Sequence, residues 1–275
     1  MAIITISREM GSGGIPIVHE VAEKLGYTLV DREAILEVAD RYGLSEEDVE
    51  CADEKPPAFV DELDKKTAVN LHTIELIILD FALKGNIIVY GRGGQDLLKD
   101  VNNVFRVRII APFEERVERW AEREWLDPDL AYTLVRKSDQ QRAGFIKYFF
   151  DRDWADPLYY DLTINTSRLS EETAVNMICD GVSDGNLVER KEGAKLRLAE
   201  LILQKKIEIA LLRSEALEGL HIDIRVQGAT VELRGHVHSN AELQQVIKIA
   251  RETPGVTDAV NRIKVVGYRT TPGEH

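Results

Sequence analysis

The sequence of 275 residues contains little cysteine, no long apolar run and no excess of basic side chains. Its two cysteines, Cys51 and Cys179, form neither a disulfide framework nor a metal-binding spacing. The formal net charge of -13 argues against a broad nucleic-acid surface and against an anionic membrane as the main partner. The amino terminus lacks the basic start and the apolar length of a signal peptide, and no segment is long enough to span a membrane. We therefore expect a cytoplasmic protein with reduced thiols.

The chain begins with a short β-branched run, Ile3–Ile6, which leads into a glycine-rich turn and then a helical pattern from Pro16. This is the layout of a phosphate-binding loop, in which backbone N–H groups and a helix N-terminus attract an anion. The usual G-K-[ST] ending is missing, because Gly14 stands at the lysine position and Ile15 at the hydroxyl position. Arg8 and Ser12 are then the candidates for direct phosphate contact, with a plain turn and a surface arginine as the alternatives.

Strand patterns alternate with helical patterns over about 180 residues, which predicts an α/β domain with a parallel sheet and helices on both faces. In such sheets ligands bind beyond the carboxyl ends of the strands. Three turns that contain glycine or charged residues follow those strand ends, at residues 11–14, 31–33 and 91–94. Their convergence predicts a binding site at this edge.

The character of the sequence changes near Gly185, where a polar, glycine-containing stretch predicts a linker. Beyond it, a helix, a hairpin with its turn at Gly228, a second helix and a last alternating strand predict a small α+β domain. The predicted organisation is a first domain, a linker, a second domain and a tail, at residues 1–184, 185–193, 194–268 and 269–275.

The first domain resembles the cytidylate kinase-like family of nucleoside monophosphate kinases. The segments that carry the resemblance are Ile6–Gly14 (ISREMGSGG), Leu25–Asp31 (LGYTLVD), Val89–Gly93 (VYGRG), Ala111–Val117 (APFEERV), Asp139–Arg142 (DQQR) and Asp161–Ser170 (DLTINTSRLS). The resemblance implies a P-loop NTPase-type core with a mobile lid. It also implies transfer of the γ-phosphoryl group from ATP, with Mg²⁺, to a monophosphate such as CMP.

The resemblance also implies roles for individual residues. Asp139 and Arg142, which share one helix face, fall in the lid, and Arg136 lies one turn earlier. The expected catalytic residues are Asp139 and Arg142, together with Arg8 beside the glycine-rich loop. The nucleotide-binding set is Gly11, Ser12, Gly13, Gly14 and Arg136, and the acceptor-binding set is Asp31, Arg32 and Arg92. A solvated charged helix is the alternative for the lid residues, and a salt bridge is the alternative for Arg92. No protein-ligated metal site is expected.

Two features leave the substrate and the activity open. Bacterial cytidylate kinases carry a small residue after the aspartate and an arginine a few residues on, whereas this chain has Arg32 and Glu37. The loop also lacks both the lysine and the arginine that normally follows the double glycine in the kinase-like branch. The alternative function is therefore a catalytically weak or inactive nucleotide sensor or scaffold.

The second domain resembles a BON domain. The resemblance rests on Ile222–Val226 (IDIRV), Val231–Gly235 (VELRG), Ala241, the helix at 246–251, Pro254–Asn261 (PGVTDAVN) and Ile263–Val265 (IKV). It implies a docking role, and we expect the partner to be another protein or a second copy of the chain. Nucleotides are the expected small-molecule partners.

Overall fold

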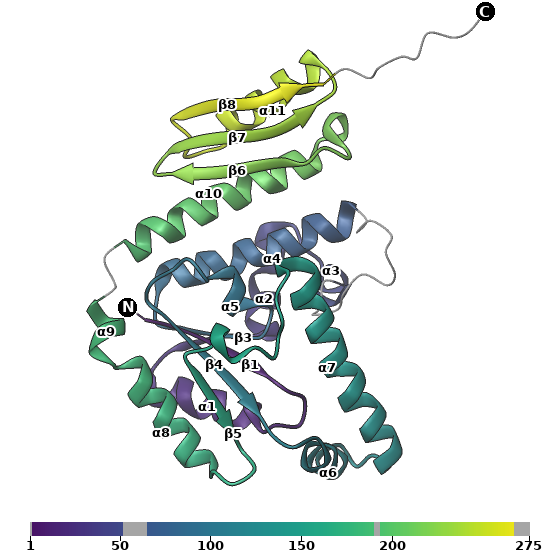
Figure 1. Ribbon diagram of the computed structural model, residues 1–275, viewed down its shortest axis with the longest axis vertical. Helices are drawn as coiled ribbons and strands as arrows, with labels where there is room; N and C mark the ends of the chain where they lie inside the picture. The colour runs from purple at the N-terminus through teal and green to yellow at the C-terminus, as the bar shows by residue number, and fades with distance from the viewer. Residues whose placement is uncertain (1, 52–64, 190–192, 267–275) are drawn as a thin grey trace, which may run out of the picture.

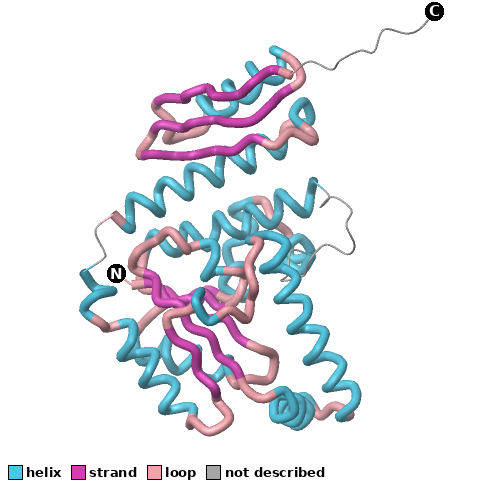
Figure 2. The backbone as a smooth tube through the Cα atoms, viewed as in Figure 1, coloured by secondary structure: helices cyan, strands magenta, loops and turns pink. Residues whose placement is uncertain are grey.

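The computed structural model describes residues 2–51, 65–189 and 193–266. Its larger body is a parallel five-stranded sheet in the order β2-β3-β1-β4-β5, with helices on both faces (Figures 1 and 2). The strands are β1 (Ile3–Arg8), β2 (Thr28–Val30), β3 (Ile87–Tyr90), β4 (Val104–Ile110) and β5 (Leu162–Asn165). Strand β1 pairs with β3 and β4 and is buried along most of its length, as its continuous apolar run predicts for a central parallel strand.

The helices of this body fall into two layers. On one face of the sheet, α1 (Gly14–Leu25) and α8 (Glu171–Val182) cover a core that includes Ile4, Ile6 and Ile109. On the other face, the elements of the chain between β2 and β4 cover a core that includes Ile3, Ile87 and Val104. These elements are α2 (Arg32–Ala39), the 3-10 turn η1 (Asp40–Tyr42), α3 (Glu46–Cys51), α4 (Lys65–Lys84) and α5 (Gly94–Leu97).

Two packed helices extend from the carboxyl edge of the sheet. Helix α6 (Phe113–Glu124) follows β4, and α7 (Pro128–Phe150) packs against it at a steep angle, since Figure 1 shows α6 nearly end-on and α7 along its length. Asp127 starts α7 by accepting hydrogen bonds from the amides of Asp129 and Leu130, with Pro128 in the first helical position. The 3-10 turn η2 (Pro157–Tyr159) leads to β5.

The second body is a three-stranded sheet in the order β6-β7-β8. The predicted hairpin is confirmed, because β6 (Ile222–Gln227) and β7 (Thr230–Val237) pair antiparallel around Gly228. Helix α11 (Asn240–Glu252) then crosses over, so that β8 (Asp258–Val265) pairs parallel with β7. The 3-10 turn η3 (Glu215–Leu217) precedes the sheet, and α10 (Ala194–Arg213) lies between it and α4 (Figure 1).

The region predicted as a linker is partly helical. Helix α9 (Gly185–Glu189) occupies its first half, and Gly193 precedes α10. Residues 190–192 and the predicted tail from 269 lie outside the described residues. Helix α10, which the sequence-based boundary assigns to the second domain, contributes buried side chains to both hydrophobic cores.

Candidate functional site

The glycine-rich loop joins β1 to α1 at the carboxyl edge of the first sheet. Gly11 and Gly13 have φ angles of 79° and 78°, which glycine adopts without the penalty that a side chain brings. The Ser12 hydroxyl donates a 2.7 Å hydrogen bond to the Glu9 carbonyl, and Ser12 is 1% exposed. The Ser12 side chain therefore closes the loop on itself in this structure.

The loop contacts a buried arginine of α6 and a half-buried aspartate of α7. Asp139 Oδ1 accepts the Met10 amide at 2.9 Å, and Asp139 Oδ2 accepts Arg116 Nη1 at 2.6 Å. Arg116 is 5% exposed and also donates to the carbonyls of Met10 and Ala111, each at 2.9 Å. A Cβ atom on Gly11 would lie 2.4 Å from the Arg116 carbonyl oxygen, so the loop and the first turn of α6 are in backbone contact.

A second group of buried side chains supports the same loop from the sheet. Glu9 accepts Arg108 Nη2 at 3.3 Å and lies 3.3 Å from Arg116 Nε. Arg108 is 4% exposed and stacks on Trp154, with its guanidinium carbon 4.2 Å from the ring centroid. Burial raises the pKa of Tyr160, which keeps its hydroxyl proton and donates it to the Trp154 carbonyl at 2.9 Å. Arg108 was not predicted from the sequence, and neither Glu9 nor Arg116 was predicted as a support of the loop.

Beside the loop lies a cavity of about 580 Å³, enclosed by α1, α7 and the ends of β2 and β3. Five of the residues predicted for the site line it, namely Arg8, Asp31, Arg32, Arg92 and Arg142. The other lining residues are Ile15, Val18, His19, Leu29, Glu33, Tyr90, Ser138 and Gln141. The turns after β2 and β3 thus line one cavity, together with Arg8 and Ile15, which flank the turn after β1. Gly11–Gly14, Asp139 and Arg136 are not among the lining residues, and Arg136 is exposed on α7.

Arg8 occupies the space that Gly14 leaves open. The Arg8 guanidinium carbon lies 4.2 Å from the centroid of the Tyr90 ring, a cation–π distance. A Cβ atom on Gly14 would come within 3.3 Å of both Arg8 Cβ and the Tyr90 hydroxyl oxygen. Arg8 and Tyr90 therefore leave little room for a side chain at position 14.

The other charged groups come from three elements. Arg142 on α7 donates a 2.7 Å hydrogen bond to Ser138 and lies 3.8 Å from Asp139. Arg92 is 9% exposed and has a φ of 57° in the turn after β3. Asp31 caps α2 by accepting the Ala34 amide at 3.0 Å, and Arg32 forms an ion pair with Glu50 of α3.

Four arginines and two carboxylates therefore share a cavity with three apolar residues, Ile15, Val18 and Leu29. Guanidinium groups bind phosphate oxygens in fixed geometry, and the apolar wall suits a flat or carbon-rich group. The arrangement fits a small phosphomonoester. No cluster of three or more possible metal ligands occurs within residues 2–51, 65–189 and 193–266.

Comparison with known proteins agrees with this geometry. Residues 3–168 match the sequence model of the cytidylate kinase-like family, which is more than half of the chain. The chain belongs to the cytidylate kinase-like family. Residues 200–267 match the BON domain, so the match begins within α10. Both resemblances predicted from the sequence are confirmed.

The chain is similar to the cytidylate kinase of Staphylothermus marinus, with 29% identity over 181 residues, which cover 65% of this chain and 94% of the relative. The cytidylate kinase of Natronomonas pharaonis is 28% identical over 191 residues, covering 66% of this chain and 94% of the relative. A solved structure of an uncharacterized protein from Eubacterium ventriosum has a TM-score of 0.52 at 22% identity, covers 67% of this chain and 99% of that chain, and supports the fold.

Membership of the cytidylate kinase-like family supports a nucleoside monophosphate kinase-like function for the first domain. The predicted fold class is likewise confirmed, with the parallel sheet flanked by helices and the small BON sheet at the carboxyl end. Among the helices that the structure describes, none has the length and apolarity needed to cross a bilayer.

Proposed function

We propose that this protein binds a nucleoside monophosphate in the cavity and transfers to it the γ-phosphoryl group of ATP. The observation that carries the proposal is the convergence of Arg8, Arg32, Arg92 and Arg142, from four separate segments, on one cavity in an acidic chain. Phosphoryl transfer depends mainly on positioning and charge neutralisation, which such a set of arginines supplies.

The loop is the proposed site for the donor phosphates. The amides at the start of α1 have no partner inside the helix, and the helix dipole favours an anion there. Arg8, held on Tyr90, supplies the positive charge that position 14 lacks. Asp139 acts in this proposal as a positioning residue, because its carboxylate holds the Met10 amide and not the cavity.

The acceptor phosphate is proposed to bind Arg92 and Arg142, with Arg32 at the wall formed by α2. One of its oxygens attacks the γ-phosphorus, the bond from that phosphorus to the β–γ bridging oxygen breaks, and ADP leaves. The apolar residues Ile15, Val18 and Leu29 would contact the rest of the acceptor. Glu37, a departure from the bacterial kinases, does not line the cavity, and Arg32 does. CMP is the first acceptor to test.

Mg²⁺ commonly uses one or two carboxylates together with substrate phosphates, and Asp31 and Glu33 are the carboxylates that line this cavity. Their hard oxygen donors fit the ion, which when bound would neutralise charge on the phosphate oxygens. Asp31 is already fixed by its hydrogen bond with Ala34, so its second oxygen is the available ligand.

The second candidate function is a nucleotide sensor or scaffold with weak or no catalysis. Ile15 favours it, because an apolar side chain lines the cavity where the family normally has a cation. Pro16, which has no N–H, also removes one donor from the first turn of α1. Each lost charge-assisted contact costs about 1.5–3 kcal/mol of binding.

The test is an assay for nucleoside diphosphate formation with the purified full-length chain, ATP, Mg²⁺ and each monophosphate in turn. We expect turnover with at least one acceptor and loss of turnover in Arg142→Ala. Saturable nucleotide binding without turnover would select the sensor. The absence of both binding and turnover would refute the kinase and the sensor and would leave the scaffold. Unchanged turnover in Arg142→Ala would remove the lid assignment of that residue.

We also keep the sequence-based proposals for partner and location. The BON domain presents the outward side chains of its sheet to solvent, including Arg225, Arg234 and Lys264, which supports docking to another protein or a second copy. The cytoplasmic location is supported by the two cysteines, which are both free thiols in the structure.

A further inference from the structure

Helix α10 has apolar side chains on two faces, and each face is buried in a different core. Ala194, Leu198 and Ile202 belong to the core between the large sheet and α4. Leu203 and Ile207 belong to the core of the BON sheet. A helix that is apolar on more than one face is expected to be buried between two bodies. Figure 1 shows α10 in that position, with β6 on one side and α4 on the other.

Buried charges fasten α10 to α4. The side-chain ammonium of Lys205 lies 2.7 Å from Glu75 Oε2 on α4 and 2.6 Å from Glu208 Oε2 on its own helix. It also lies 2.8 Å from His72 Nδ1 on α4. The Lys205 side chain is only 13% exposed, so removal of its partners would leave a charge in an interior.

Two further contacts hold α10 to both bodies. Arg197 Nη2 lies 3.2 Å from Asp100 Oδ2, in the segment that follows α5. Glu200, which is 9% exposed, accepts the Gly228 amide of the β6–β7 turn at 2.7 Å. The BON sheet, α10 and the kinase-like body are therefore joined by packing and by polar contacts.

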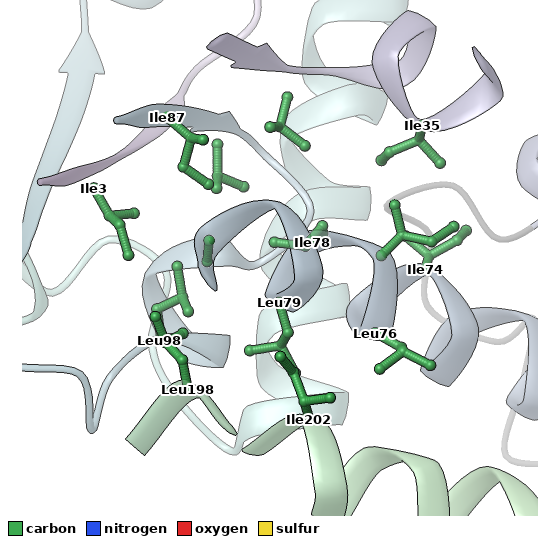
Figure 3. Close-up of a cluster of buried hydrophobic side chains, with 14 of the residues drawn as sticks. Ile3, Ile35, Ile74, Leu76, Ile78, Leu79, Ile87, Leu98, Leu198 and Ile202 are labelled. Carbon is green, nitrogen blue, oxygen red and sulfur yellow. The ribbon is translucent and has the colours of Figure 1, made fainter. Parts of the chain in front are cut away.

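The same core reaches the wall of the cavity. Ile35, three residues after Arg32 on α2, belongs to one continuous cluster with Ile74 and Ile78 of α4 and with Leu198 and Ile202 of α10. In the close-up, Leu79 points toward Ile202 and Leu98 toward Leu198, while Ile35 faces Ile74 from the other side (Figure 3). Helix α4 is thus packed between the cavity wall and the helix that carries the BON domain.

We propose that the BON domain regulates the acceptor site through α10 and α4. A monophosphate held by Arg32 fixes α2, α2 packs on α4, and α4 packs on α10, so acceptor binding stabilises the arrangement of the BON domain. Coupling of binding free energies is reciprocal, and a partner that holds the BON domain therefore changes the affinity of the cavity. This inference rests on the proposed acceptor function.

The experiment is hydrogen exchange on the full-length protein, with and without CMP, for the unmodified chain and for Ile202→Ala. Ile202→Ala removes packing against α4 from a residue that is 7% exposed. Leu196→Ala is the matched control, because Leu196 lies on the same helix and is 57% exposed. We expect CMP to slow exchange in α2 and also in α10 and β6–β8.

In Ile202→Ala we expect faster exchange in α2 and α3 without ligand, and CMP affinity lower by about 5-fold or more, the low end of typical coupling. Leu196→Ala should change neither. Lys205→Met, which keeps an unbranched side chain one atom shorter and removes the charge, is the second variant if Ile202→Ala does not fold. It should shift α2 exchange in the same direction.

The coupling is overturned if CMP protects only the cavity segments and if Ile202→Ala or Lys205→Met loosens α10 without a change in α2 and α3. CMP that changes exchange nowhere would instead count against the acceptor function. In that case faster α2 exchange in Ile202→Ala would still support coupling between α10 and α2 through α4. Failure of the acceptor function is therefore distinguishable from failure of the coupling.

Discussion

At the scale of single residues, the loop lacks a charged side chain at position 14, and an arginine from the end of β1 lies beside it. Position 14 has no side chain, and the space beside it holds Arg8 stacked on Tyr90. Asp139, in contrast to Arg8, does not line the cavity. The sequence places it on one helix face with Arg142, yet its carboxylate binds the loop amide and Arg116, while Arg142 reaches the cavity. Neighbours on a helix face can thus serve two separate tasks.

Arg92 gives the residue-scale prediction. Arg92→Ala should weaken monophosphate binding by about 10- to 100-fold, since a charge-assisted contact contributes about 1.5–3 kcal/mol. Lys137→Ala, an exposed cation on α7 away from the cavity, is the control and should leave the affinity unchanged. Titration calorimetry with CMP measures both. Equal affinities in the two variants would show that Arg92 does not contact the phosphate.

At the scale of elements, the loop is fixed by the packed helices α6 and α7. The Arg116 side chain connects the loop to α7 through Asp139, and the Arg116 backbone touches Gly11. The predicted start of α1 at Pro16 is two residues late, because the helix begins at Gly14. The short helix α5 was also not predicted, since the sequence analysis read Gly91–Gly94 as a turn alone.

Two alanine substitutions separate the roles of the loop glycines. Gly13→Ala should cost about 1–2 kcal/mol of unfolding free energy, because its φ is positive and no atom lies within 4 Å of the added Cβ. Gly11→Ala carries the same backbone penalty and places its Cβ 2.4 Å from the Arg116 carbonyl. We expect it to cost at least about twice as much. Urea unfolding measures the difference, and equal losses would contradict the contact with α6.

At the scale of the whole molecule, the two domains share a helix. Burial alone would raise the pKa of Glu75, but the positive charge of Lys205 and the hydrogen bonds with His72 and Lys205 lower it to about 2. Since Glu75 lies on α4 and Lys205 on α10, we expect the packing of α10 on α4 to weaken at low pH.

The sign of that dependence follows from the lowered pKa. The stabilisation is fully present above the ordinary pKa of 4.5 and is lost as the pH falls toward about 2. We expect this pair to account for about 3 kcal/mol of acid-induced loss in unfolding free energy. Glu75→Gln should be less stable at pH 7 and should flatten the curve between pH 5 and pH 3. Glu118→Gln, an exposed carboxylate on α6, is the control, and identical curves for the two variants would refute the assignment.

The sequence by itself determined the elements and the edge at which the site lies. Continuous apolar runs such as Ile87–Tyr90 favoured buried strands, and the ends of these strands and the turns after them placed Arg8, Asp31 and Arg92 at one edge. These signals are local, because they depend on side-chain periodicity and turn geometry.

Tertiary structure decided which charged groups meet and how the domains join. Whether Asp139 faces the cavity or the loop depends on the position of the Arg116 side chain, which the spacing of these residues in the sequence does not predict. Helix α10 has apolar residues on two faces, so its sequence pattern does not predict which elements pack against it. Only packing, which brings together residues far apart in the chain, shows that its two partners are α4 and the BON sheet.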